Sequence, residues 1–121
     1  MPEILLRFCE GAAVVLYRDE PGVHAENVPA RVDLFEYAGG YAWGYGGSGP
    51  NAVSHAIAGK LFEVVPLSHT ELAERAHVIL DRVVGQLAGE KEHTIPYRSL
   101  VALFPNDELD EIYELDGADG D

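Results

Sequence analysis

The residues closest to a chemical motif are residues 46–50, which read Gly-Gly-Ser-Gly-Pro. A serine between glycines before a helix is typical of a nucleophile elbow, in which a sharp turn exposes the hydroxyl group beside backbone amides. The motif fails at its last position, where Pro50 replaces glycine, and nothing in the sequence selects an acid for a triad with His55. We therefore interpret Ser48 or Gly49 as the cap of the following helix and expect no catalytic residue.

The same glycines offer a second chemistry, because free N–H groups at a helix N-terminus attract phosphate or carboxylate. One hypothesis is a nucleotide- or small-molecule-binding domain that uses the amides of residues 46–49 and the rings of Trp43 and Tyr45. Neither nucleotide fingerprint is complete, since the Lys-Ser/Thr ending and the Gly-x-Gly-x-x-Gly order are missing. The alternative is that the glycines allow a tight turn from strand to helix, with both rings packed over it.

The five histidines do not make a metal motif. None forms the His-x-x-x-His pair of a zinc-protease helix, and Cys9 is the only cysteine, so we expect neither a metal nor another cofactor. His55 lies off the apolar stripe of the first predicted helix, and we expect it to be exposed unless a partner covers it. His69 and His77 are also predicted to face solvent.

Acidic residues outnumber basic ones by 21 to 8, which gives a net charge of −13. Residues 107–121 hold eight of the acidic residues and none of the basic ones. This charge repels phosphate backbones and anionic membranes, so the expected partner is a basic protein rather than nucleic acid or lipid. The acidic run is either a surface that imitates DNA phosphates or a solvated terminus. The predicted acidic surface comprises Asp107, Glu108, Asp110, Glu111 and Glu114.

A chain of 121 residues suits one compact domain. We expect that domain to span residues 1–115, followed by a disordered acidic tail over residues 116–121. Arg7 interrupts the first apolar run, and no run reaches the roughly 20 residues that cross a bilayer, so a cytoplasmic protein is expected. Cys9 falls on an apolar strand and is interpreted as a buried, inert thiol.

The elements that would position these residues predict an α+β domain. Apolar runs at residues 4–9 and 12–17 flank Glu10-Gly11 and predict a β-hairpin. A third strand is expected at residues 32–35 and a fourth at residues 41–43. We therefore predict a small, mostly antiparallel sheet, made of the hairpin plus one or two strands, packed against two or three helices.

Apolar spacing and end signals predict the helices. The first should span residues 50–62. Ser68 and Glu71 fit a capping box that begins a long core helix, which we expect to continue to a left-handed Gly89. Shorter helical segments are predicted at residues 96–104 and 106–113.

Residues 41–50 also resemble the signature of a family of small uncharacterised proteins from bacteria, phages and plasmids. That signature reads as an aromatic residue, Glu, and then Trp-Gly-Tyr-Gly-Gly-Ser-Gly-Pro. Residues 43–50 match all eight closing positions, whereas Ala42 replaces the Glu, and His55 stands where the family usually carries an aliphatic residue. The resemblance implies an α+β domain in a mobile-element or accessory setting, and it implies no established activity.

The leading hypothesis is a non-enzymatic, acidic accessory protein that binds a protein partner and is compatible with a homo-oligomer. A sharper version binds a basic, nucleic-acid-handling protein by charge mimicry. The contact is expected through the acidic surface or through the aromatic-glycine segment, whose predicted binding residues are Tyr41, Trp43, Tyr45, Gly46, Gly47, Ser48, Gly49 and, on the adjoining helix, His55.

Overall fold

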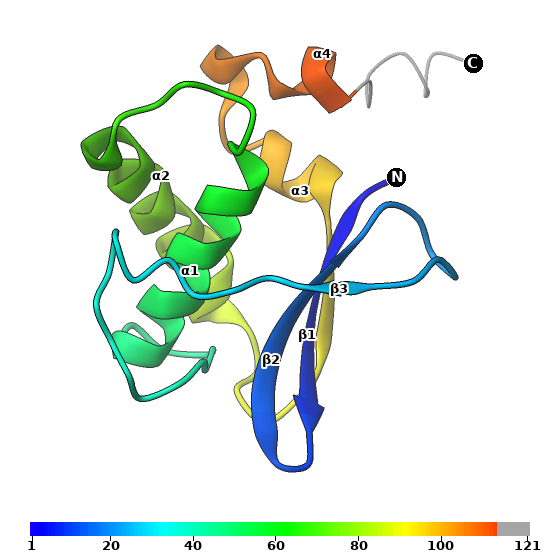
Figure 1. Cartoon of the computed structure of the whole chain (residues 1–121), viewed down its shortest axis with the longest axis vertical. Coiled ribbons are helices and arrows are strands. Elements are labelled where there is room, and N and C mark those ends of the chain that lie inside the picture. The colour runs from blue at the N-terminus through cyan, green and yellow to red at the C-terminus, as the bar shows by residue number, and fades with distance from the viewer. Residues whose placement is uncertain (114–121) are drawn as a thin grey trace.

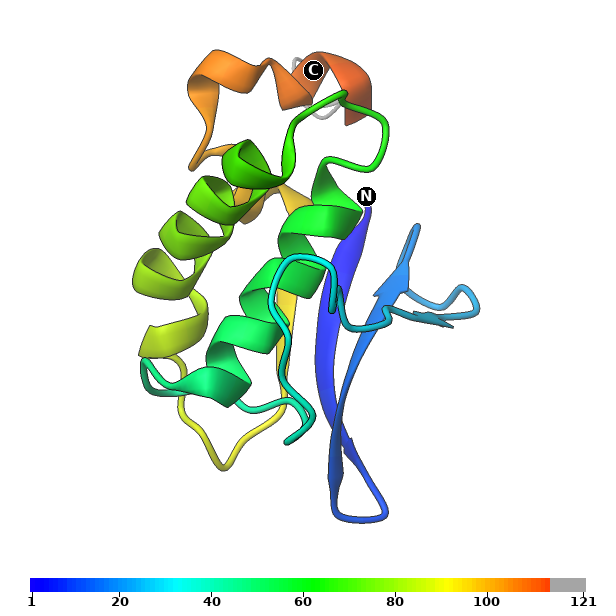
Figure 2. The same ribbon diagram turned by 60° about the vertical axis from the view of Figure 1, so that its left-hand side comes forward.

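The computed structural model describes residues 1–113 (Figure 1). Glu114 of the predicted acidic surface, the end of the predicted domain and the predicted disordered tail lie outside these residues. The strands are β1 (Glu3–Cys9), β2 (Ala12–Arg18), β3 (Glu26–Asn27) and β4 (His93–Pro96). They form an antiparallel sheet in the order β3-β2-β1-β4. The helices lie on one side of this sheet (Figure 2), so the predicted α+β fold is confirmed.

The predicted hairpin is confirmed, and its turn explains its register. Glu10 and Gly11 both have positive φ angles, of 54° and 82°, as a two-residue type I′ turn requires. Cys9 therefore pairs with Ala12, and the pairing continues along the whole of β1 and β2. This register turns Ile4 and Leu6 of β1 toward the helices, where both are fully buried.

Replacing Glu10 with Asn should stabilise the hairpin. A non-glycine residue at positive φ is strained, and Asn tolerates this conformation better than Glu. We expect Glu10→Asn to raise the free energy of unfolding by about 0.5–1 kcal/mol, measured by urea titration. Glu20→Asn, at another exposed acidic position, changes the charge equally and should give no such gain. Equal effects of the two substitutions would contradict the turn explanation.

The third and fourth predicted strands were wrong. Residues 32–35 form a turn, in which the N–H groups of Leu34 and Phe35 both donate to the carbonyl oxygen of Arg31, and residues 41–43 are irregular. The sheet is instead completed by the short β3 and by β4. β4 was missed because Pro96 marks both its last residue and the start of the next helix. The aromatic residues that suggested strands are used for packing on helices and in the core.

The helices are α1 (Ser48–Leu61), α2 (His69–Arg82), α3 (Tyr97–Val101) and α4 (Leu109–Tyr113), with 3-10 turns η1 (Val84–Gln86) and η2 (Pro105–Asp107). The capping box of α2 is confirmed, since Ser68 Oγ accepts from the Glu71 N–H at 3.1 Å and Glu71 Oε1 from the Ser68 N–H at 2.9 Å. α2 ends earlier than predicted, and Gly89 is not left-handed. The carbonyl oxygen of Val84, beyond the helix end, binds the Gly44 N–H instead.

α1 is the central helix of the fold. Figure 2 places it between α2 and the sheet, and 11 of its 14 residues are buried. Its small residues, such as Ala56 and Gly59, allow this close packing on several sides. The single apolar stripe predicted for this helix therefore accounts for only part of its burial.

Cys9 is exposed near the tip of the hairpin, which corrects the expected buried thiol. The hairpin extends beyond the helices, and the residues around its turn are exposed (Figure 2). Among residues 1–113, no helix combines the length and apolar character that crossing a bilayer requires.

Candidate functional site

Trp43, which the nucleotide-binding hypothesis uses to stack on a ligand and the alternative packs over the turn, is part of the hydrophobic core. Its side chain is 2% exposed, and its indole N–H donates to the carbonyl oxygen of Lys91 at 2.8 Å. The indole ring packs on Phe8 and His93, with centroid distances of 5.1 and 6.4 Å. Trp43 therefore ties the irregular segment before α1 to the hairpin and to the chain that leads into β4.

The glycines around Trp43 allow two backbone segments to touch. Gly44 has a φ angle of 98°, and its N–H donates to the Val84 carbonyl oxygen at 3.0 Å. A Cβ atom on Gly44 would lie 2.7 Å from the Leu87 carbonyl oxygen and 2.8 Å from the Gly89 backbone. A Cβ atom on Gly89 would similarly lie 2.9 Å from the Trp43 carbonyl oxygen. These contacts favour the architectural interpretation of this part of the segment.

The helix cap was predicted wrongly. The N-cap of α1 is Gly47, which has no side chain to cap the helix, and Ser48 is the first helical residue. Gly49 is required by packing, because a Cβ atom there would lie 2.7 Å from the Ala42 Cβ atom. Tyr45 and Gly46 are the open part of the segment, with Tyr45 53% exposed and free space beside Gly46.

His55, predicted to be exposed, is only 3% exposed. Its Nδ1 lies 2.8 Å from the carbonyl oxygen of Asn51, and its ring stacks on Phe35 with a centroid distance of 5.1 Å. His77 of α2 approaches edge-on, at 5.8 Å. His77 and His69 are themselves exposed, as predicted. His55 therefore attaches the 31–37 loop to the central helix.

The buried His55 should make the protein sensitive to acid. Burial lowers the pKa of the imidazole below its ordinary value of about 6.5, and nearby His77 acts in the same direction. The unfolded chain then binds a proton more readily than the folded chain, so the free energy of unfolding falls as the pH drops below about 6.5. We expect His55→Gln to weaken this dependence in urea titrations between pH 7 and pH 5. His24→Gln, at an exposed position, should leave it unchanged.

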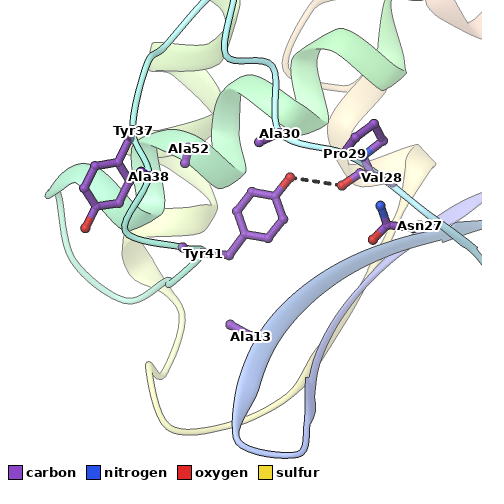
Figure 3. Close-up of a pocket in the computed structure, with 10 residues that line it drawn as sticks. Ala13, Asn27, Val28, Pro29, Ala30, Tyr37, Ala38, Tyr41 and Ala52 are labelled. Atoms are coloured by element: carbon purple, nitrogen blue, oxygen red, sulfur yellow. Dashed lines mark hydrogen bonds between the residues drawn. The ribbon is translucent and has the colours of Figure 1, made fainter.

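Tyr41 lines a cleft of about 270 Å³ between the hairpin, the 37–41 loop and α1 (Figure 3). Its hydroxyl group donates to the Val28 carbonyl oxygen at 3.0 Å, and burial raises its pKa to about 12. The other lining residues are mostly small or apolar: Ala13, Asn27, Val28, Pro29, Ala30, Tyr37, Ala38, Gly40 and Ala52. Only Tyr41 of this set was predicted as a binding residue. Pro29, two residues after β3, is the sequence signal that could have indicated where the chain leaves the sheet beside this cleft.

Of the residues predicted to form the acidic surface, Asp107 is held in an ion pair, whereas the other described residues are exposed or partly exposed. Asp107 accepts two hydrogen bonds from the guanidinium group of Arg75 on α2, at 2.9 and 3.0 Å. Glu108 and Glu111 are exposed, and Asp110 is partly exposed. Asp107 is therefore engaged in holding the C-terminal segment on the protein, and the neighbouring carboxylates are left for solvent or a partner.

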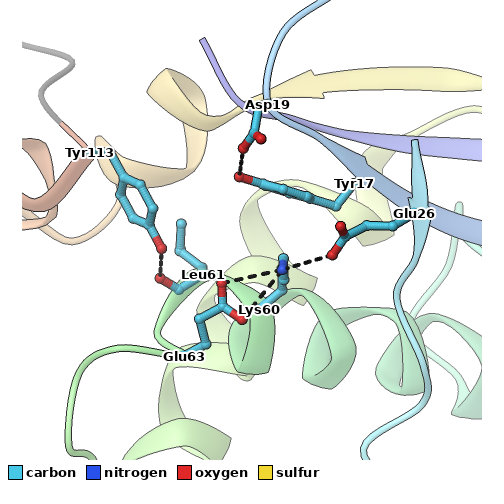
Figure 4. Close-up of polar contacts among 7 residues, drawn as sticks. All are labelled: Tyr17, Asp19, Glu26, Lys60, Leu61, Glu63 and Tyr113. Carbon is cyan, nitrogen blue, oxygen red and sulfur yellow. Dashed lines mark hydrogen bonds and ion pairs between the residues drawn. The ribbon is translucent and has the colours of Figure 1, made fainter. Parts of the chain in front are cut away.

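In a polar cluster beside β2, the charge of Lys60 is compensated by ion pairs (Figure 4). Its ammonium group lies 3.3 Å from Glu26 and 3.2 Å from Glu63, and 4.3 Å from the centre of the Tyr17 ring. Tyr17 in turn donates to Asp19 at 2.6 Å. The nearby Tyr97 hydroxyl is buried and has no hydrogen-bond partner among residues 1–113, and burial raises its pKa. The cluster connects α1 to the sheet and lines up no nucleophile with a base.

In the described part of the chain, no group of three or more His, Cys, Asp or Glu residues is arranged to hold a metal. Comparisons with protein-family models, curated proteins and solved structures find no match to this chain. The fold and the geometry of the sites therefore carry the functional argument.

Proposed function

We propose that this chain is a small, non-enzymatic accessory protein that binds a basic protein partner through its acidic end, defined as residues 105–113 together with the α1–α2 connection. The observation that carries the proposal is the fixed position of this acidic segment. A row of carboxylates held in place can match the charges of a partner, whereas a free terminus loses entropy on binding.

Three contacts fix the segment. The side chain of Leu109 is fully buried in the core. The Tyr113 hydroxyl donates to the carbonyl oxygen of Leu61 at 2.6 Å, which joins α4 to the end of α1. The Asp107 pair with Arg75 adds a bidentate link to α2, of a geometry that restricts both side chains.

The acidic end also offers apolar contact area. Ile112 of α4 is 43% exposed and Val64 of the α1–α2 connection is 66% exposed. The α1–α2 connection lies beside α4 in both Figure 1 and Figure 2. Large apolar side chains next to carboxylates are the mixture that protein interfaces use, with apolar contact at the centre and charge around it. The proposed partner surface is therefore basic with an apolar centre.

The position of Trp43 favours protein binding over the nucleotide-binding alternative. A base would need an accessible ring, but this indole is buried and its N–H is already donated to Lys91. The resemblance of residues 41–50 supports an accessory role in a mobile element. The net charge of −13 supports the finer proposal that the partner is a nucleic-acid-handling protein, bound through its basic groove.

The experiment neutralises the exposed carboxylates without removing the anchors. Purified protein is used as bait in host lysate, alongside the triple variant Glu108→Gln, Asp110→Asn, Glu111→Gln, and recovered proteins are quantified by mass spectrometry. With three exposed ion pairs lost, we expect binding of the partner to weaken about 10- to 100-fold, with a smaller dependence on salt.

The matched control is the triple variant Glu20→Gln, Asp81→Asn, Glu90→Gln, which changes the net charge equally at exposed positions elsewhere. It should recover the same protein as the wild type. The proposal is contradicted if no recovered protein depends on the acidic end, or if both triple variants lose the partner equally.

A further inference from the structure

β2 has an open edge where β3 stops. β3 pairs with Leu16 and Tyr17, and the Val28 N–H donates to the Val15 carbonyl oxygen at 2.9 Å. The next residue, Pro29, has no N–H group, and the chain leaves the sheet there. Within residues 1–113, no strand continues this pairing toward the hairpin turn.

The open edge presents the backbone of Ala13. The type I′ turn makes Cys9 and Ala12 a hydrogen-bonded pair, so Ala12 and Val14 direct their backbone groups toward β1. The alternation then directs the N–H and C=O groups of Ala13 outward, in the same direction as those of Val15. An edge with unpaired backbone groups is a template for another extended strand.

The cleft lies directly at this edge, because Ala13 is one of its lining residues (Figure 3). Its volume of about 270 Å³ is below the roughly 300–1,000 Å³ of sites for drug-sized ligands, and it suits one or two side chains. The lining is apolar at Val28 and Ala52, and the hydroxyl group of Tyr41 is already donated to the Val28 carbonyl oxygen. The cleft therefore fits an aliphatic side chain.

Two acidic residues lie close in sequence to the lining of the cleft. Glu10 precedes Ala13 by three residues and Glu36 precedes Tyr37 directly, and both are exposed. The neighbouring cations are compensated, since Arg31 pairs with Asp33 at 2.8 Å and Lys60 with Glu26 and Glu63. The charge at this site therefore complements basic residues.

We propose that the β2 edge binds an extended peptide segment of a protein partner, which adds a strand opposite Ala13, inserts one aliphatic side chain into the Tyr41 cleft and places basic residues near Glu10 and Glu36. This is strand addition, in which backbone hydrogen bonds provide affinity and the cleft selects the side chain. The site is separate from the acidic end and goes beyond the function proposed for that surface.

The test selects peptides from a phage-displayed library of random 12-residue sequences on the immobilised wild-type protein. We expect enriched sequences to alternate basic and aliphatic residues, as strand addition requires. A synthetic peptide of the most enriched sequence should slow hydrogen exchange at the Ala13 amide. Failure to enrich any sequence, or exchange protection that excludes Ala13, would overturn the proposal.

Two variants separate the edge from the cleft, with affinity for the synthetic peptide measured by calorimetry. Ala13→Pro removes the outward N–H group, and Ala38→Leu fills the cleft from an exposed loop position; each should weaken binding about tenfold. Ala102→Leu, an exposed alanine of the α3 end, should have no effect. The triple variant of the acidic end should bind the peptide with wild-type affinity. A failure of the strand-addition proposal can therefore be distinguished from a failure of the proposed function. Full affinity in Ala38→Leu would overturn the cleft as the site.

Discussion

Gly44→Ala is expected to destabilise the fold by about 3 kcal/mol, and so to lower the melting temperature by about 10 °C or more. Part of this cost comes from the φ angle of 98°, which an L side chain rarely adopts. The rest comes from the Cβ atom, which would lie 2.7 Å from the Leu87 carbonyl oxygen. The Leu87 oxygen is a backbone atom, and the position of the Cβ atom is fixed by the backbone of residue 44. The strain is therefore relieved only if the segment around Gly44 moves away from residues 87–89.

The control for this substitution lies two residues away. Gly46 does not have a positive φ angle, and a Cβ atom there would meet nothing within 4 Å. Gly46→Ala should therefore change the free energy of unfolding by no more than about 0.5 kcal/mol. Comparable melting temperatures for the two variants, measured by differential scanning calorimetry, would refute the view that Gly44 is an architectural contact.

Leu109→Ala should destabilise the protein by about 2–5 kcal/mol, although Leu109 lies on a helix of only five residues within the acidic end. The side chain is fully buried in the core, and removing it leaves a cavity. Urea titration followed by circular dichroism measures this loss. The result bears on function, because Leu109 is the main apolar anchor of the carboxylates on Glu108 and Glu111.

The comparison residue is Ile112, on the same helix and 43% exposed. Ile112→Ala should alter the free energy of unfolding by no more than about 0.5 kcal/mol, while reducing partner binding, because this side chain belongs to the proposed interface. A similar loss of stability in both variants would mean that α4 does not dock through one buried side chain. A stable Leu109→Ala variant would remove the basis for a rigid acidic row.

Local signals in the sequence were sufficient for the hairpin and for the start of α2. Glu10-Gly11 specifies a two-residue turn, and Ser68 with Glu71 forms a capping box, since each motif depends on residues only a few positions apart. The short helical turn that carries Leu109 was likewise predicted. These features need no knowledge of the rest of the fold.

The errors came from contacts between distant segments. His55 was expected to be exposed because one apolar stripe was assumed for α1, but α2 and the loop carrying Phe35 cover the other faces. Trp43 was expected on a strand, but it lies in an irregular segment, and its indole N–H donates to the Lys91 carbonyl oxygen 48 residues later in the chain. Likewise, the cleft at Tyr41 depends on where β3 ends. Periodicity within one segment does not carry this information.

The exposed thiol of Cys9 allows the hairpin tip to be labelled chemically. Because it is the chain's only cysteine and its thiol is exposed, a maleimide dye or spin label attaches at one defined point without mutagenesis. Without a reducing agent, two molecules can be cross-linked through their tips as covalent pairs unrelated to any native association. Attachment to a surface through this thiol would hold every molecule in the same orientation, with the acidic end directed away from the support.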